Sequence, residues 1–421
     1  MGFKIVAGNI SYDYIIFNNS LSLSKKRNLT RLRKRTITIS SLFDEKRAYT
    51  AQAEIFDSDK WARPEHIYGY DNNHLNILYF TEGSEYVMTR VVNHLFSDLL
   101  QFESRIINLS AEFDSDFCSR YKYTSSPVMK MMVASPFSIA LSECNMKHCG
   151  KNSLFELICG QHSNQYVNYI NNTFPLLGPL DNKACITCYE NNKVTKVPLL
   201  YTLDLKCSFH EVREVIVKQG IHQLKVKIDS NIESLKNTID LISLIKTSFP
   251  NVLLYLDANQ SFIDCLAFKN DFLLPLQKKI PDALSFILGF EEICMSPFKQ
   301  NIDIISSLGT KIYLDENSGG IEDLLSIKKF GYGIALKATR PLSILSAQII
   351  YANYNKIPLC VQDLTFNSTS LIHNVYLRNF ISCEIGIESN YGYLIKEKVG
   401  NSFEDFRWDD IVKNGSVKLT M

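Results

Sequence analysis

Short apolar runs alternate with longer amphipathic stretches from about residue 197 onward. The first run, "VPLLYTLD", is followed by a helix-like stretch from Ser208 to Gln219 that Gly220 ends. Further runs follow, mostly separated by enough residues for a helix: "QLKVKID", "NVLLYLDAN", "LSFILGFEE", "KIYLDEN", "YGIALKATR", "IPLCVQDLT" and "ISCEIGIES". This alternation predicts eight parallel strands joined by helical crossovers, and therefore a closed β/α barrel.

The region before residue 197 has a different pattern. "RTITISSLF" and "RAYTAQAEIF" alternate like antiparallel strands, and "FSIALSECNMKHCGKNSLFELI" has a helical apolar period. The stretches near 57–75 and 161–196 read as loops or insertions. We therefore predict an α/β protein with an α+β domain over 1–196 and a barrel over 197–395.

The bulk composition limits the class of protein. The chain has 421 residues, too many for one ordinary core, and its 46% hydrophobic and 21% charged residues are typical of a soluble globular protein. A net charge of +1 argues against a general nucleic-acid binder. The apolar runs fall short of the roughly 20 residues of a membrane span, and the N-terminus lacks the order of a secretory signal. We expect a cytoplasmic protein that binds neither nucleic acid nor membrane.

Eleven cysteines are scattered along the chain. Cys185 and Cys188, in "CITC", have the spacing of metal ligands, but no second CxxC and no paired histidine motif lies nearby. We interpret this pair as free thiols in a loop.

Charged residues follow the apolar runs of the predicted barrel. Lysines end the second and sixth runs, and carboxylates end the three runs between them. In chain order these residues are Lys225 with Lys227, Asp257, Glu291 with Glu292, Asp315 with Glu316, and Lys337. A single Asp after a strand is commonly a turn former, but an ordered series at the ends of barrel strands is typical of an active site.

These residue types suit one kind of chemistry. Three carboxylates from adjacent strands can converge on an octahedral Mg²⁺. A substrate carboxylate bound to that ion has its charge neutralised, and its α-proton becomes more acidic because the enediolate left behind is stabilised. A nearby cation and partial desolvation lower the pKa of a lysine toward that of a working base. Lys227 and Lys337, on opposite sides of the carboxylates, would face opposite sides of the α-carbon.

The motifs "KVK", "DAN", "FEE", "DEN" and "LK", in this order, resemble the muconate lactonizing enzyme subgroup of the enolase superfamily over roughly residues 130–395. The resemblance implies a modified (β/α)7β TIM-type barrel that carries the metal site. It implies that the N-terminal α+β domain is a capping domain and that the C-terminal segment, residues 396–421, packs back against it. It also implies a small-molecule carboxylate substrate and a homo-oligomer, because relatives commonly form dimers or octamers.

Matched residue by residue, the resemblance implies a role for each motif. Asp257, Glu291 and Asp315 would bind Mg²⁺. Lys227 and Lys337 would be the acid/base pair, and Lys225 would help to stabilise the substrate carboxylate. Asn259 and Glu316 would not bind the metal themselves but would orient the metal ligands and the lysines.

The sequence departs from the subgroup at two places. Glu291-Glu292-Ile293 replaces the usual Glu-Gln-Pro. We choose Glu291 as the ligand because it follows "LGF" in register, with Glu292 as a competitor. "VQDLTFNS" replaces the usual end of the seventh strand, which leaves substrate specificity open.

The early loop of the capping domain selects the substrate in this family, and "SLSLSKKRNLTRLRKR" corresponds to it. Cations in the loop proper are candidates for contact with an anionic part of the substrate: Lys25, Lys26 and Arg27. The alternating arginines that follow are interpreted as an exposed strand face: Arg31, Arg33 and Arg35.

The eighth run carries a second hint about the substrate. Its period-two spacing places Glu384, Gly386 and Glu388 on one face, where Glu388 could receive an ammonium group. Dipeptide epimerases of this subgroup use two aspartates on this strand, in an Asp-x-Asp arrangement, so the match is partial. A solvated strand end or a core ion pair is an equal alternative.

Three functions follow from these residues. The first is a racemase or epimerase acting at the α-carbon of a carboxylate such as a dipeptide or an N-acyl amino acid. The second keeps the same metal and lysines but acts as a lyase or cycloisomerase, like o-succinylbenzoate synthase. The third is a binding relative without catalysis, which the retention of all the ligands and both lysines disfavours.

Overall fold

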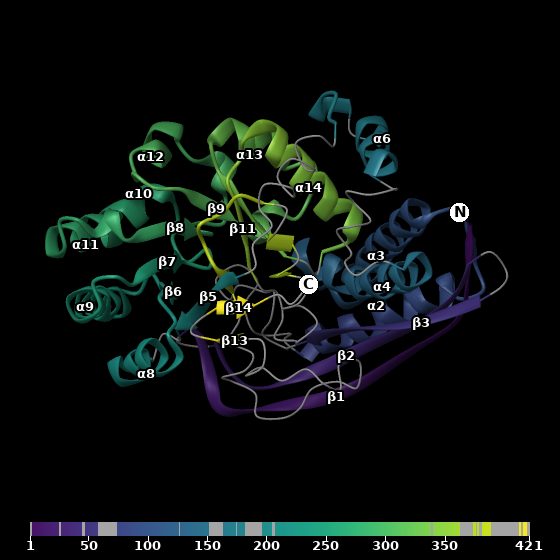
Figure 1. The fold of residues 1–421 in the computed structure, drawn as a ribbon, viewed down its shortest axis with the longest axis horizontal. Helices are drawn as coiled ribbons and strands as arrows, with labels where there is room; N and C mark the ends of the chain where they lie inside the picture. The colour runs from purple at the N-terminus through teal and green to yellow at the C-terminus, as the bar shows by residue number, and fades with distance from the viewer. Residues whose placement is uncertain are drawn as a thin grey trace.

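The molecule consists of two regions that pack side by side (Figure 1). In the computed structural model, an antiparallel sheet with its helices lies beside a ring of parallel strands surrounded by helices. The structure describes residues 2–24, 27–43, 47–57, 74–125, 127–150, 163–173, 175–181, 196–203, 207–337, 340–362, 374–375, 377–378, 381–388, 412–413 and 416–418.

The N-terminal sheet is built around a long hairpin. β1 (Phe3–Ser24) runs antiparallel to β2 (Arg27–Phe43), and β3 (Arg47–Asp57) pairs with the other edge of β2. A short strand, β4 (Leu95–Phe96), pairs with β1. The two strands predicted in this region lie within β2 and β3, so the antiparallel pattern is confirmed.

Helices pack on this sheet and bury its apolar positions. They are α2 (His74–Val91), α3 (Leu99–Tyr121) and α4 (Pro127–Cys149). Ile37 and Ile39 of β2 are fully buried, as the period of two along a strand requires of one face. Phe80 of α2 and Phe102 of α3 belong to the same core. α4 contains the predicted helical run as far as Cys149, whereas 151–158 of that run and 58–73 of the predicted insertion near 57–75 lie outside the described residues.

Two arginines of β2 show that the expectation of an exposed strand face is wrong. Arg33 and Arg35 are buried, and both pair with Asp57 of β3, at 2.9 and 3.0 Å. Arg35 also donates hydrogen bonds to the backbone carbonyls of Phe80 in α2 and Met132 in α4. Alternating cations on a strand indicate an exposed face only where the protein offers them no hydrogen-bond acceptors. Here a carboxylate and helix carbonyls supply the acceptors.

The eight apolar runs of the second region form strands in the predicted order. They are β5 (Lys196–Leu203), β6 (Gln223–Lys227), β7 (Leu253–Asp257), β8 (Ile287–Glu291), β9 (Ile312–Leu314), β10 (Gly333–Leu336), β11 (Leu359–Val361) and β12 (Ile387–Glu388). Strands β5 to β11 pair in sequence order, all parallel, and β12 pairs in parallel with β5. These strands form a nearly closed barrel, so the predicted fold class is confirmed.

Helices follow most of these strands and cover the outside of the ring (Figure 1). They are α8 (Phe209–Gln219), α9 (Ile232–Ser248), α10 (Cys265–Phe268), α11 (Leu274–Lys279), α12 (Ile302–Ser306), α13 (Leu324–Phe330) and α14 (Leu342–Asn355). The boundaries of α8 follow from its sequence. Ser208 and Glu211 form a reciprocal capping box at its start, and Gly220 ends it with a φ of 66°.

Side chains fill the inside of the barrel, so a site that binds a substrate can form only at one of its ends. The buried residues inside the ring are Leu200, Tyr255, Tyr313, Ala335, Cys360 and Ile385. A second and larger apolar layer lies between the strands and the surrounding helices. Polar side chains that converge within the described barrel therefore do so at its carboxyl end.

Two further segments pack against the barrel. α6 (Ser163–Thr173) lies within the stretch predicted as an insertion, and its Val167 and Ile170 are buried in the barrel core beside α14. β13 (Val412–Lys413) and β14 (Ser416–Lys418) form a hairpin, and β14 pairs antiparallel with β5. The predicted domain boundaries, and the return of 396–421 to the capping domain, stay predictions.

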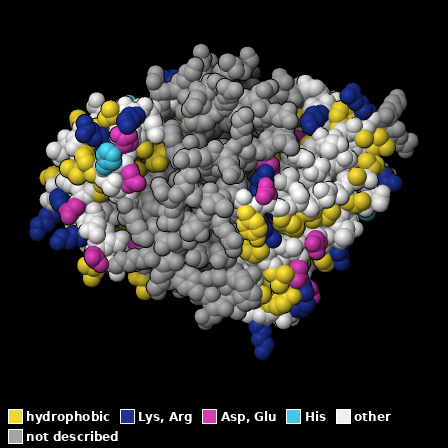
Figure 2. Space-filling view, turned by 90° about the horizontal axis from the view of Figure 1, so that it is seen from below, with side chains coloured by type: hydrophobic (Ala, Val, Ile, Leu, Met, Phe, Trp, Pro, Cys, Tyr) yellow, Lys and Arg dark blue, Asp and Glu magenta, His cyan; other side chains and the backbone are white. Residues whose placement is uncertain are grey.

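The described surface carries charges of both signs. At the left of Figure 2, Lys, Arg, Asp and Glu side chains lie close to one another around the first barrel helices. This mixture agrees with the net charge of +1. None of the helices among the described residues combines the length and the apolar run needed to span a bilayer.

Candidate active site

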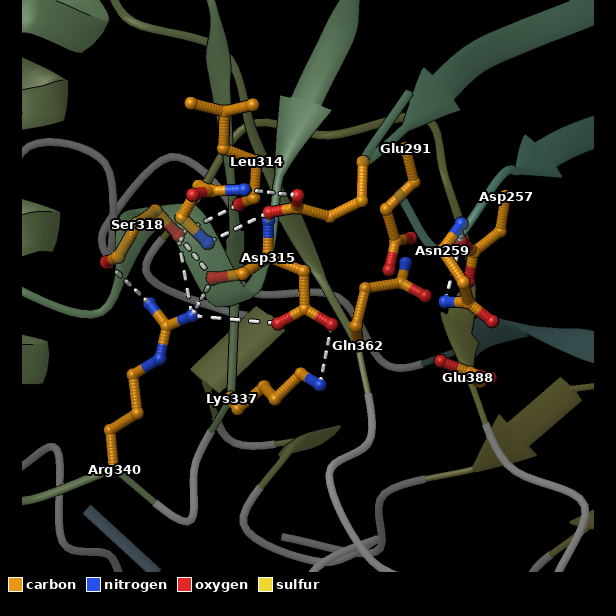
Figure 3. Close-up of polar contacts among 12 residues, drawn as sticks. Asp257, Asn259, Glu291, Leu314, Asp315, Ser318, Lys337, Arg340, Gln362 and Glu388 are labelled. Atoms are coloured by element: carbon orange, nitrogen blue, oxygen red, sulfur yellow. Dashed lines mark hydrogen bonds and ion pairs between the residues drawn. The ribbon is translucent and has the colours of Figure 1, made fainter. Parts of the chain in front are cut away.

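The carboxyl ends of β6 to β10 bring the predicted site residues together, and Figure 3 shows Asp257, Glu291, Asp315 and Lys337 among them. The parallel register places Lys227 beside Asp257, and Asp257 beside Glu291. Side chains at matched positions of adjacent strands point to the same side of a sheet. Asp315 and Lys337 directly follow the last residues of β9 and β10. The ordered series of strand-end residues thus occupies one end of the barrel.

The ammonium group of Lys225 contacts residues at the ends of four other strands, β7, β8, β11 and β12. Its Nζ is 3.0 Å from carboxylate oxygens of Asp257, Glu291 and Glu388 and from the amide oxygen of Gln362. Burial alone would lower the pKa of Lys225, but the attraction of the three carboxylates outweighs it and raises the pKa well above its usual value. Lys225 therefore stays protonated and holds these carboxylates together.

Asp257 contacts two lysines and one asparagine. Its Oδ2 is 2.5 Å from Nζ of Lys227 and 3.0 Å from Nζ of Lys225. Its Oδ1 accepts hydrogen bonds from the backbone nitrogen and Nδ2 of Asn259, both at 2.9 Å. Burial would raise the pKa of Asp257, but Lys225 and Lys227 outweigh it and lower the pKa below its usual value. Asn259 thus touches the carboxylate that it is predicted to orient.

Asp315 occupies the other side of the site, with Lys337 and Arg340 (Figure 3). Its Oδ2 is 2.6 Å from Nζ of Lys337, and its Oδ1 is 3.7 Å from a terminal nitrogen of Arg340. Burial would lower the pKa of Lys337, but Asp315 and Glu316 outweigh it and raise the pKa. Burial, followed by repulsion from Asp315, raises the pKa of Glu316 to about 7.

The adjacent glutamates after β8 have different surroundings. Glu291 reaches Lys225, as described above. Glu292 has a φ of 43° and accepts hydrogen bonds from the backbone nitrogen of Asp315 at 2.5 Å and from both nitrogens of Asn317 at 2.9 and 2.7 Å. Nε2 of Gln260 also donates to Glu292, at 3.3 Å. The Glu292 carboxylate therefore accepts from four donors, three of them in the segment that carries Asp315, which favours Glu291 as the candidate ligand.

The negative charge at this end of the barrel exceeds the positive charge. The carboxylates in these contacts are Asp257, Glu291, Glu292, Asp315, Glu316 and Glu388, and the cationic side chains are Lys225, Lys227, Lys337 and Arg340. Burial and neighbouring carboxylates raise the pKa of both Glu291 and Glu292 well above the usual value. Counted as fully ionised, the six carboxylates outnumber the four cationic side chains by two, and the raised pKa values of Glu291 and Glu292 reflect this excess.

These residues fit a divalent cation by charge and by chemistry. Within the described chain, no three His, Cys, Asp or Glu side chains are grouped closely enough to enclose a metal as they stand, because lysines contact the carboxylates. Oε2 of Glu291 and Oδ1 of Asp315 are buried and have no hydrogen bond of good geometry from the described residues, although Lys225 lies 3.0 Å from the first and Arg340 3.7 Å from the second. Carboxylate oxygens are the ligands that Mg²⁺ prefers. The donor set and the excess charge are therefore suited to Mg²⁺.

The remaining predicted residues have different outcomes. Glu388 receives an ammonium group, but it is that of Lys225, and it also accepts a hydrogen bond from Thr202 at 2.6 Å. Several predictions fall outside the description: Lys25, Lys26, the side chains of Arg27 and Arg31, and the pair Cys185 and Cys188.

Two residues of the site were missed by the sequence reasoning. Gln362 follows the seventh apolar run and bonds Lys225, so the rule applied to charged strand ends would have found it if it had included amides. Arg340 lies three residues after Lys337 and donates to the backbone carbonyl of Asp315 at 3.0 Å. Only its spacing from Lys337 could have signalled it.

Comparison with known proteins adds a structural likeness and no sequence match. No protein-family model matches the chain, and no curated protein matches it. A mandelate racemase/muconate lactonizing protein from Herpetosiphon aurantiacus superimposes with a TM-score of 0.63 at 12% identity, covering 99% of this chain and 96% of that one. A dipeptide epimerase from Methylococcus capsulatus, complexed with Mg and the dipeptide L-Arg-D-Lys, gives 0.63 at 14% identity, covering 99% and 97%. Muconate lactonizing enzyme gives 0.59 at 14%, covering 99% and 94%.

The chain has the mandelate racemase/muconate lactonizing enzyme fold. The similarity extends over both the capping region and the barrel, since 99% of the chain is covered in each comparison. The resemblance predicted from the strand-end motifs is thereby confirmed in the fold. In this enolase-type fold, known members include epimerases as well as a lactonizing enzyme, and the identities of 12–14% do not select among them.

Proposed function

We propose that this protein is an enolase-superfamily enzyme that removes the proton α to a substrate carboxylate and returns it, as a racemase or epimerase of a dipeptide or an N-acyl amino acid. One observation carries the proposal: Lys227 and Lys337 come from strands on either side of three carboxylate-bearing strands, at one end of one barrel. Two bases that flank one site are what inversion at a carbon atom requires.

Each lysine has a defined starting position. Nζ of Lys227 lies against Asp257, and Nζ of Lys337 lies against Asp315. In the proposed reaction one Nζ takes the α-proton from one face of the substrate, and the other Nζ delivers a proton to the opposite face. The buried ammonium of Lys225 would stabilise the substrate carboxylate, because its charge is fixed in a site of low solvent access.

We assign Asp257, Glu291 and Asp315 as the residues that hold Mg²⁺. Bound there, the ion would neutralise the substrate carboxylate, acidify its α-proton and offset the excess negative charge of the site. Asn259 would keep Asp257 oriented, and Glu292 would keep the Asp315 segment in place. Glu316, beside Lys337, would help to adjust the charge around that lysine.

A lyase or cycloisomerase is the second candidate function. It is supported by the likeness to muconate lactonizing enzyme, which is almost as strong as that to the dipeptide epimerase. In that case one lysine would still exchange a proton at the α-carbon, but the product would not be an inverted, labelled form of the substrate.

The test is α-proton exchange in D₂O with Mg²⁺, followed by mass spectrometry and chiral chromatography. Dipeptides, N-acyl amino acids and precursors of succinylbenzoate would be offered to the wild type, Lys227→Ala and Lys337→Ala. Loss of an acid/base group should slow exchange by about 10²–10⁴-fold. Lys218→Ala, which removes an exposed lysine from α8, is the control and should leave exchange unchanged.

Inverted and deuterated product would support the racemase or epimerase. Product without inversion would favour the lyase. Inversion that survives in both lysine variants, or exchange of both epimers in either variant at the wild-type rate, would contradict the proposal. Exchange that occurs equally without Mg²⁺ would contradict it too.

A further inference from the structure

A carboxylate of the capping region is buried against the barrel. Glu103 of α3 is 2% exposed. Its Oε1 accepts a hydrogen bond from the backbone nitrogen of Leu342 at 3.0 Å, and its Oε2 accepts one from the backbone nitrogen of Ser343 at 2.5 Å. The hydroxyl of Ser138, in α4, also donates to Oε1. Glu103 thus joins two capping helices to the first two residues of α14.

The start of α14 needs an acceptor from elsewhere. The first N–H groups of a helix have no partner within it, and a side chain of the preceding residue commonly supplies one. The residue at that position is Pro341, which makes no side-chain cap. A carboxylate at a helix N-terminus also interacts favourably with the helix dipole. Glu103 supplies the acceptor from a different region of the chain, and burial raises the pKa of its carboxyl.

The residues around the start of α14 also hold the Asp315 side of the candidate site. Arg340 donates to the backbone carbonyls of Asp315 at 3.0 Å and Ser318 at 3.3 Å, and to the amide oxygen of Gln348 in α14 at 2.8 Å. Gln348 donates in turn to the carbonyl of Ser318 at 2.5 Å. The side chains of Arg340, just before α14, and of Gln348, in α14, therefore both form hydrogen bonds with the segment from Asp315 to Ser318.

The same segment touches the capping helix α4 directly. A Cβ built on Gly319, the residue after Ser318, would lie 2.6 Å from Cε of Met131. α4 thus packs closely against the turn that follows Asp315. The comparable segment at Asp257 is instead bonded to β8, through the backbone nitrogen of Ala258 and the carbonyl of Glu291. The capping helices therefore contact one side of the site through α14 and this turn.

We propose that Glu103 is a positioning residue through which the capping domain sets the Asp315 and Lys337 side of the active site. By fixing the first residues of α14, it fixes Arg340 and Gln348, and through them the backbone around Asp315. The Asp257 and Lys227 side does not depend on this contact. The catalytic role of Glu103 rests on the function proposed above. Its effect on the backbone around Asp315 can be measured without any substrate.

Amide hydrogen exchange of the full chain tests it. Glu103→Gln keeps the shape but turns an NH₂ group toward a backbone donor, so one hydrogen bond is lost. We expect exchange to rise about tenfold, the size of one such bond, at residues 342–346 and 315–318. Residues 253–257 should exchange as in the wild type. Glu112→Gln, on an exposed part of α3, should change neither segment.

A second control separates positioning from stability. Ile106→Val removes one methyl group from the buried face of the same helix and does not alter the contacts of Glu103. The inference is overturned if Ile106→Val reproduces the pattern of Glu103→Gln, if the increase stops at 342–346, or if 253–257 changes equally. Should Glu103→Gln not fold, Ser138→Ala removes one donor to Glu103 together with one acceptor of the Leu342 nitrogen, and the same two segments should respond.

The exchange rates of the two epimers distinguish positioning from a purely structural role, because a structural role would change both rates equally. With a substrate that exchanges its α-proton, Glu103→Gln should slow exchange through Lys337 more than exchange through Lys227, so the two epimers lose rate unequally. An equal loss for both epimers would contradict positioning. Absence of exchange with every substrate would count against the proposed function alone, because the amide exchange result does not depend on it.

Discussion

At the scale of single residues, the backbone conformation directs the side chains of the adjacent Glu291 and Glu292 to different partners. Glu291 ends β8 and reaches Lys225, whereas Glu292 has a left-handed φ and binds the backbone of the Asp315 segment. The subgroup has a Gln at the position of Glu292. A carboxylate there accepts from four donors but adds a negative charge, which is one source of the excess at this end of the barrel.

The two glutamates should differ in their effect on Mg²⁺ affinity. Groups that orient a ligand typically contribute about 10–100-fold in affinity, so we expect a loss of that size for Glu292→Gln and a larger one for Glu291→Gln. Titration calorimetry with MgCl₂ measures both. A larger loss for Glu292→Gln would make Glu292 the ligand.

The sequence predicted which strand ends meet at the candidate site, because the chain position of a strand-end residue is set by its apolar run. It did not predict the partner of Glu388, since Lys225 and Glu388 meet only when β12 pairs with β5 and the ring closes. The choice between Glu291 and Glu292 depended on one backbone angle, which no side-chain pattern reports.

At the scale of elements, buried arginines that form ion pairs within the capping sheet also join that sheet to its helices by hydrogen bonds. Arg33 and Arg35 of β2 share Asp57 of β3, and Arg35 reaches both α2 and α4. The sequence pattern suggested exposure because it shows the spacing of the cations but not the helix carbonyls that face them. The strands themselves were predictable, since their apolar alternation is local.

Replacing Arg35 should destabilise the protein far more than replacing an exposed arginine of the same sheet. Removing one partner of a buried ion pair costs about 3–5 kcal/mol, and we expect the lower end for Arg35→Met because Arg33 still pairs with Asp57. Arg47→Met, at an exposed position of β3, is the control. Urea unfolding of both variants measures the difference. Equal losses would show that burial of Arg35 contributes little.

At the scale of the whole molecule, the excess negative charge links ion binding to stability. A cation that binds only the folded chain stabilises it by about 2.7 kcal/mol at 100 times its dissociation constant. We therefore expect Mg²⁺ to raise the melting temperature of the wild type in scanning calorimetry. Asp257→Asn should lose most of this increase, and Asp240→Asn, at an exposed position of α9, should keep it. The same increase in both variants would place the ion elsewhere.

The first barrel strand depends on the last segments of the described chain. β5 pairs with β12 along one part of its length and with β14 along another. A ribosome releases β5 long before either partner, so during synthesis this edge has open hydrogen-bonding groups while β6 to β11 can already pair. The capping region, whose strands and helices are all made before β5, can fold first. Closure of the ring, and with it the meeting of Glu388 and Lys225, is then among the last events in the production of the protein.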